Sequence, residues 1–181
     1  MHDVKDKNIT LTPLDLISKL GQFDLDPCGL QFHKTATKII SLPDDGLVEN
    51  WAGRVWLNPP YSNPKPFIEK LSEHGNGIAL VLNSTDTVWF QEYGLKKANG
   101  MFLLKGRPKF TRMDMTDVSI MRGVVLFAYG AENNELLKNC LIGFLTAVYK
   151  KEDLKEFRFI KSKAEDYIFW LSILKKIKTA S

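Results

Sequence analysis

A rigid, proline-rich loop between a strand and a helix is the feature that most constrains the fold of this chain. Residues 54–57 are predicted to form a buried strand, and residues 58–66, which follow, contain four prolines and cannot form regular structure. Apolar positions spaced for a helix follow and stop at Gly75, and residues 77–83 form a nearly continuous apolar run, typical of a strand buried on both faces. Strand, loop, helix and strand together predict a βαβ unit.

The same alternation extends along most of the sequence. We expect helices at residues 13–20, 87–97, 131–149 and 163–178, and strands at residues 23–26, 37–41, 101–104 and 120–129. The first of these helices has Thr12 as its N-cap, Pro13 at its first position and Gly21 at its end. The pattern predicts an α/β fold with a mainly parallel sheet and helices on both faces.

The length of 181 residues, with 44% hydrophobic and 25% charged residues, fits one globular domain. We therefore expect residues 1–181 to form a single compact unit, with residues 131–181 as a helical extension of it. No apolar run is long enough to span a bilayer, and the charged N-terminus does not resemble a secretory signal, so we expect a cytoplasmic protein. Cys28 and Cys140 lack the spacing of a zinc site, so we expect two thiols and no metal.

Basic side chains are concentrated in the middle of the chain. Residues 96–122 carry seven basic and two acidic side chains, together with Phe102 and Phe110. This composition suits a polyanionic partner, but a solvated basic surface has the same composition. Charge alone leaves both interpretations open.

Two predicted strands end in loops with functional side chains, at Asp26 and at Asn58. Ligands of open α/β sheets bind at the carboxyl ends of the strands. In the second loop the side-chain oxygen of Asn58 and the carbonyl of Pro59 could accept both hydrogens of an NH₂ group on a planar substrate, while Tyr61 stacks on its ring. Such hydrogen bonds make the nitrogen a better nucleophile, so the loop suits transfer of a group to an amine without a metal.

Structural alternatives exist for several of these residues. Adjacent prolines after a strand can serve only as a rigid turn, and Asp26 before a proline can serve only to cap that turn. The tryptophans are expected to pack in the core, and the histidines to occupy ordinary surface or loop positions.

Several motifs in one order resemble the phage-type DNA adenine-N(6) methyltransferase (Dam) family. The resemblance covers about residues 10–127, and its motifs are residues 23–28, 45–47, 51–62, 85–90 and 106–110. It implies a Rossmann-like, S-adenosylmethionine-dependent methyltransferase fold. Asn-Pro-Pro-Tyr also occurs in methyltransferases that act on RNA guanine and on protein glutamine, so this loop indicates the reaction more than the substrate.

The resemblance also implies roles for individual residues. The target adenine would be held by Asn58, Pro59, Pro60 and Tyr61. The cofactor would be bound by Thr12, Pro13, Asp26, Pro27 and Cys28, and by Asp45 at its ribose hydroxyls. The sequence has Gly29 where the family pattern would have alanine.

The resemblance also implies that the basic segment, residues 96–122, binds DNA. An enzyme that modifies adenine in double-stranded DNA must neutralise phosphates and flip the base. The expected phosphate contacts are Lys105, Arg107, Lys109 and Arg112. Two alternatives remain: an amino-group methyltransferase acting on RNA or a protein amide, and a catalytically silent DNA-binding protein that counters restriction.

Overall fold

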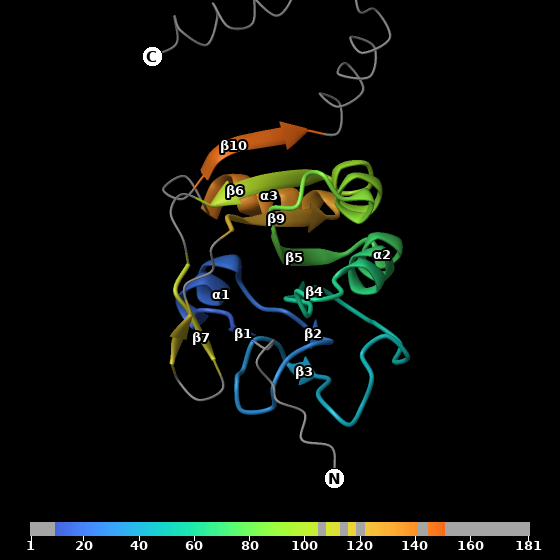
Figure 1. Ribbon diagram of the computed structural model, residues 1–181, viewed down its shortest axis with the longest axis vertical. Coiled ribbons are helices and arrows are strands. Elements are labelled where there is room, and N and C mark those ends of the chain that lie inside the picture. Colours follow the sequence, from blue (N-terminus) through green and yellow to red (C-terminus); the bar gives the residue numbers. More distant parts are fainter. Residues whose placement is uncertain (1–9, 105–107, 113–115, 119–121, 141–144, 151–181) are drawn as a thin grey trace, which may run out of the picture.

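The computed structural model describes residues 10–104, 108–112, 116–118, 122–140 and 145–150 (Figure 1). Its main sheet has seven strands in the order β10-β6-β9-β5-β4-β2-β3. These are β2 (Leu25–Asp26), β3 (Lys38–Ile39), β4 (Val55–Leu57), β5 (Gly77–Leu82), β6 (Gly100–Leu104), β9 (Val124–Tyr129) and β10 (Leu145–Lys150). A second sheet, in the order β1-β7-β8, contains β1 (Thr10–Leu11), β7 (Phe110–Arg112) and β8 (Asp117–Val118).

Five strands of the main sheet share one direction. The β3, β2, β4 and β5 strands pair in parallel, whereas β9 is antiparallel to both β5 and β6, and β10 is antiparallel to β6. The predicted α/β sheet is therefore mainly parallel in strand direction, with antiparallel pairing at the β9 side. The carboxyl ends of β2 and β4 lie next to each other, as the sequence predicted for the loops that follow them.

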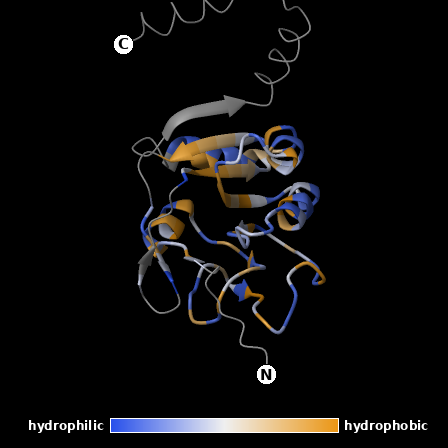
Figure 2. Cartoon of the chain, viewed as in Figure 1, coloured by the Kyte–Doolittle hydropathy of each residue, from blue (hydrophilic) through white to orange (hydrophobic). Residues whose placement is uncertain are grey.

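Helices cover both faces of this sheet. On one face, α1 (Leu14–Leu20) and α3 (Ala131–Cys140) pack on a core that includes Trp56 and Phe102. On the other face, α2 (Lys65–His74) and η1 (Phe90–Leu95) pack on a core that includes Phe127. Consecutive strand residues supply the two cores in turn, as the alternation of side chains along a strand requires. Figure 2 shows the apolar central strands between these helices.

Local signals account for the position of most helices. The α1 helix begins at Leu14 with Pro13 at its N-cap position, so the prediction of Thr12 as N-cap is wrong, and the Thr12 hydroxyl bonds Asn58 instead. The α2 helix begins at Lys65, within the segment predicted to be irregular, and ends before Gly75, which is left-handed and donates its N–H to the carbonyl of Leu71. The helix predicted at residues 87–97 is present in part, since η1 is a short π-helix.

The prediction of a helix over residues 131–149 is wrong for its last part. The α3 helix ends at Cys140, and Leu145–Lys150 form β10, paired antiparallel with β6. Without β10, β6 would leave the hydrogen-bonding groups of its outer side unpaired, and Thr146, Val148 and Tyr149 have high β-propensity. The helix predicted at residues 163–178 lies outside the described residues. No helix in the described part of the chain has the length and apolar character needed to cross a membrane.

Candidate active site

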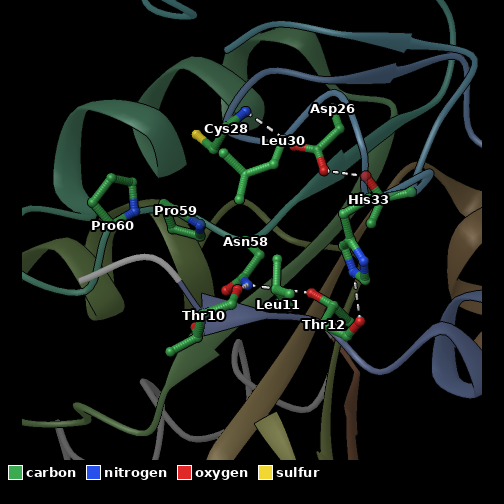
Figure 3. Close-up of a pocket in the computed structure, with 12 residues that line it drawn as sticks. Thr10, Leu11, Thr12, Asp26, Cys28, Leu30, His33, Asn58, Pro59 and Pro60 are labelled. Atoms are coloured by element: carbon green, nitrogen blue, oxygen red, sulfur yellow. Dashed lines mark hydrogen bonds between the residues drawn. The ribbon is translucent and has the colours of Figure 1, made fainter. Parts of the chain in front are cut away.

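A pocket lies at the carboxyl ends of β2 and β4, next to β1 (Figure 3). The space within it, counted together with the open solvent at its mouth, is about 420 Å³. The lining residues come from three segments: Thr10, Leu11 and Thr12; Asp26, Cys28, Gly29, Leu30, His33 and Thr35; and Asn58, Pro59 and Pro60. The structure thus brings together the two loops that the sequence predicted to meet.

The side chain of Asn58 is held by the segment that contains β1. Its Nδ2 donates to the backbone oxygen of Thr10 at 2.9 Å and to Oγ1 of Thr12 at 3.2 Å. Figure 3 shows the amide nitrogen turned toward these two residues. Its Oδ1 is buried and has no hydrogen-bond partner among the described residues. A buried acceptor without a partner is costly, which suggests that a ligand group completes the site.

The buried carboxylate of Asp26 accepts hydrogen bonds from the loop that follows β2, called here the first loop. It is 2% exposed, and its Oδ1 accepts from the backbone N–H of Cys28 at 3.0 Å, while Oδ2 accepts from the Thr35 hydroxyl. Burial raises the pKa of Asp26 from 3.8 to about 6, and these two hydrogen bonds oppose the rise. Asp26 therefore both lines the pocket and caps the turn that follows it.

The next two residues of this loop are tightly packed. Burial, together with the nearby carboxylates of Asp26 and Asp45, raises the pKa of the Cys28 thiol, so Cys28 is a poor nucleophile. A Cβ added at Gly29 would lie 2.7 Å from Cγ2 of Ile39 and 2.8 Å from the carboxyl carbon of Asp26. An alanine at this position would therefore force the side chain of Ile39 or Asp26 to shift.

The loop that contains Asp45 packs beside the pocket. Asp45 is exposed and does not line the pocket, and its Oδ1 accepts from the backbone N–H of Leu47 at 2.8 Å. Gly46 lies directly against Pro27, because a Cβ there would come within 2.0 Å of the Pro27 carbonyl oxygen. Lys70 fastens this loop by donating to the backbone oxygens of Leu47 and Glu49, each at 2.6 Å.

Three other predicted site residues do not line the pocket. Pro13 caps α1, Pro27 packs against Gly46, and Tyr61 lies beyond the lining residues. The hydroxyl of Tyr61 is buried, and burial raises its pKa to about 12, while the neighbouring Thr10 side chain opposes the rise. The stacking of a substrate ring on Tyr61 stays a prediction.

His33 lines the pocket, whereas the sequence predicted only an ordinary surface or loop position for it. Its Nε2 lies 2.8 Å from the backbone oxygen of Thr12, and because that oxygen can only accept, Nε2 carries the proton. Thr10, Leu11, Leu30 and Thr35 also line the pocket and were not predicted. Neither a periodic pattern nor ligand spacing in the sequence marks these residues.

Two of the four predicted phosphate contacts belong to the described structure. Lys109 and Arg112 are exposed, and Arg112 lies opposite Thr10 in the pairing of β7 with β1. Lys105 and Arg107 lie outside the described residues. In the same described part of the chain, no cluster of three or more histidine, cysteine or acidic side chains is arranged to hold a metal ion.

Comparison with known proteins identifies the chain's relatives. Residues 3–136, well over half of the chain, match the family model of DNA N-6-adenine-methyltransferase (Dam). The chain is 33% identical over 96 residues to the DNA N-6-adenine-methyltransferase of Haemophilus phage HP1, and 34% identical over 97 residues to that of Escherichia phage T1. These matches cover 47% and 48% of this chain, but only 56% and 40% of the two phage proteins.

A shorter match, 55% identical over 42 residues, is to a UDP-Glc:alpha-D-GlcNAc-diphosphoundecaprenol beta-1,3-glucosyltransferase of Escherichia coli. It covers 23% of this chain and 17% of that protein, too little to indicate a shared family. The family model, in contrast, matches residues 3–136, and this match shows that the chain belongs to the DNA N-6-adenine-methyltransferase (Dam) family.

Proposed function

We propose that this protein transfers a methyl group from S-adenosylmethionine to the exocyclic amino group of adenine in double-stranded DNA. Family membership and the names of the two phage relatives support this reaction. The observation that carries the proposal is the pocket itself, in which the Asp26 loop and the Asn58 loop line one space. A methyl donor and a methyl acceptor must meet in such a space for direct transfer.

The lining residues fit a cofactor of this kind. The pocket lining offers polar side chains, Asp26 and Thr35, and apolar ones, Leu11 and Leu30, to a ligand that has both polar and apolar parts. Asp26 and Cys28 would hold the cofactor, with Asp45 at the rim of the same loop cluster. S-adenosylmethionine, when bound, supplies a methyl carbon that is electrophilic because it is attached to a positively charged sulfur.

The Asn58 loop would hold the adenine. Oδ1 of Asn58 is the buried acceptor without a partner, and the amino group of adenine is a donor that would satisfy it. The Pro59 carbonyl would accept the second hydrogen of the same amino group. Two acceptors of this kind withdraw the nitrogen lone pair from the ring, so the amine becomes nucleophilic in the place where it must react.

The substrate would reach this pocket by base flipping, since the amino group of adenine cannot meet a cofactor inside a stacked duplex. Arg112 and Lys109 are the described cations that would contact DNA phosphates, and β7 brings Arg112 close to the pocket segment Thr10–Leu11. The affinity for DNA would then depend strongly on salt.

The test is transfer of labelled methyl from S-adenosylmethionine in parallel reactions with unmethylated duplex DNA, RNA and a mixed protein substrate, followed by nucleoside analysis. The proposal requires label in N6-methyladenine from DNA. Label in RNA or protein alone would contradict it in favour of another amino-group substrate. Retardation of DNA with no calorimetric heat from S-adenosylmethionine would contradict it in favour of a catalytically silent DNA-binding protein.

A further inference from the structure

Thr12 makes a contact that differs from the cofactor role implied by the family resemblance. Its side chain is 2% exposed, and its hydroxyl lies 3.2 Å from Nδ2 of Asn58. Its backbone oxygen accepts from Nε2 of His33 at 2.8 Å. The hydroxyl oxygen and the backbone oxygen of Thr12 therefore both accept hydrogen bonds from within the protein.

The backbone oxygen of Thr10 decides which way the Asn58 amide faces. A carbonyl oxygen can only accept a hydrogen bond, so the group 2.9 Å from it must be the NH₂ end of the amide. The opposite end is then Oδ1, the atom that the proposed reaction uses as an acceptor. If the amide rotated by half a turn, two acceptors would face each other and a donor would face the substrate amine.

The segment that contains Thr10 and Thr12 is itself fixed at two points. Thr10 and Leu11 pair with Arg112 and Thr111 of β7, and His33 anchors Thr12 from the loop between β2 and β3. Figure 3 shows His33, Thr12 and Asn58 joined in one chain of hydrogen bonds. The orientation of Asn58 thus depends on segments that are distant from it in sequence.

We infer that Thr12 is a positioning residue, whose hydroxyl, together with the Thr10 carbonyl, fixes the Asn58 amide so that Oδ1 remains the acceptor for the substrate amino group. The inference rests on the proposed function for the identity of that amino group. A positioning contact and a cofactor contact differ in the kinetic effect of their loss. Loss of a positioning contact lowers the turnover number at saturating cofactor, whereas loss of a cofactor contact raises the dissociation constant of the cofactor.

The kinetic test compares Thr12→Val, which removes the hydroxyl and keeps the shape, with Thr12→Ser, which restores it. We expect Thr12→Val to lower kcat for DNA by about five- to tenfold, the effect of losing one hydrogen bond. The cofactor dissociation constant should change less than twofold, and Thr12→Ser should recover most of the lost turnover. Thr37→Val is the matched control, because the Thr37 hydroxyl donates to the Phe23 carbonyl outside the pocket lining.

A second measurement needs no activity. The side-chain NH₂ signals of Asn58, identified by their absence in Asn58→Ala, should exchange with solvent far more slowly than those of exposed asparagines. In Thr12→Val their exchange should become at least several-fold faster. The inference is overturned if these protons exchange rapidly in the unaltered protein, or if Thr12→Val weakens cofactor binding while leaving kcat unchanged. If the unaltered protein methylates no DNA, the proposed function fails, and the exchange measurement still decides the role of Thr12.

Discussion

Asp26 should make the stability of this protein depend on pH in an unusual direction. Burial raises its pKa from 3.8 to about 6, so the folded chain holds this proton more tightly than the unfolded chain does. The resulting stabilisation is complete below about pH 4 and is lost as the pH rises through 6. A difference of about two pKa units corresponds to about 3 kcal/mol in total, of which about 1.4 kcal/mol is lost between pH 5 and pH 7.5.

Asp26→Asn isolates this contribution. Asparagine stays neutral, its oxygen can accept from the Cys28 N–H, and its NH₂ group can donate to the Thr35 hydroxyl. Urea unfolding of both proteins without cofactor should show that the unaltered protein loses about 1.4 kcal/mol more than Asp26→Asn between pH 5 and pH 7.5. Parallel pH profiles of the two proteins would refute this reasoning, as would a carboxyl carbon titration by NMR that places the pKa of Asp26 below its ordinary value.

Three further predictions concern the loops around the pocket. Gly29→Ala should lower the free energy of unfolding in urea by about 1–3 kcal/mol, because the added methyl group overpacks the loop. The control Gly123→Ala should be nearly neutral, since a Cβ there meets nothing within 4 Å. Equal effects of the two substitutions would contradict the tight packing at Gly29. Lys109→Ala and Arg112→Ala should each weaken DNA binding and reduce, by about 1, the slope of the logarithm of the DNA-binding constant against the logarithm of salt concentration. Lys138→Ala on α3 is the control. An unchanged slope would show that these two cations do not contact DNA phosphates. Lys70→Met should weaken cofactor binding measured by calorimetry several-fold, because Lys70 fastens the loop of Asp45; an unchanged affinity would remove that loop from the cofactor site.

The arrangement of the site was predictable where it depended on regular strands. Asp26 ends one strand that the sequence predicted and Asn58 follows another, and parallel strands bring their carboxyl ends to one edge of a sheet. Gly75 likewise marked the end of α2, because a left-handed residue ends a helix. The start of α2 was predicted too late, since Lys65 and Pro66 belong to its first turn, where a proline is tolerated.

The parts that were missed depend on contacts between distant segments. Thr10 and Leu11 reach the pocket because β1 pairs with β7, about 100 residues later, and local spacing carries no signal of that pairing. His33 lies in an irregular loop, and its partner is a backbone oxygen, a type of contact without a sequence pattern. Leu145–Lys150 were predicted to be helical from their spacing, but pairing with β6 determines their conformation.

The role of Asn58 is decided by measuring methyl transfer to adenine in duplex DNA by Asn58→Ala at saturating S-adenosylmethionine. We expect N6-methyladenine formation to be abolished while cofactor affinity remains nearly that of the unaltered protein, because Asn58 contributes the acceptor for the adenine amino group. Methylation by Asn58→Ala at the rate of the unaltered protein would contradict the claim, as would loss of cofactor binding in that variant.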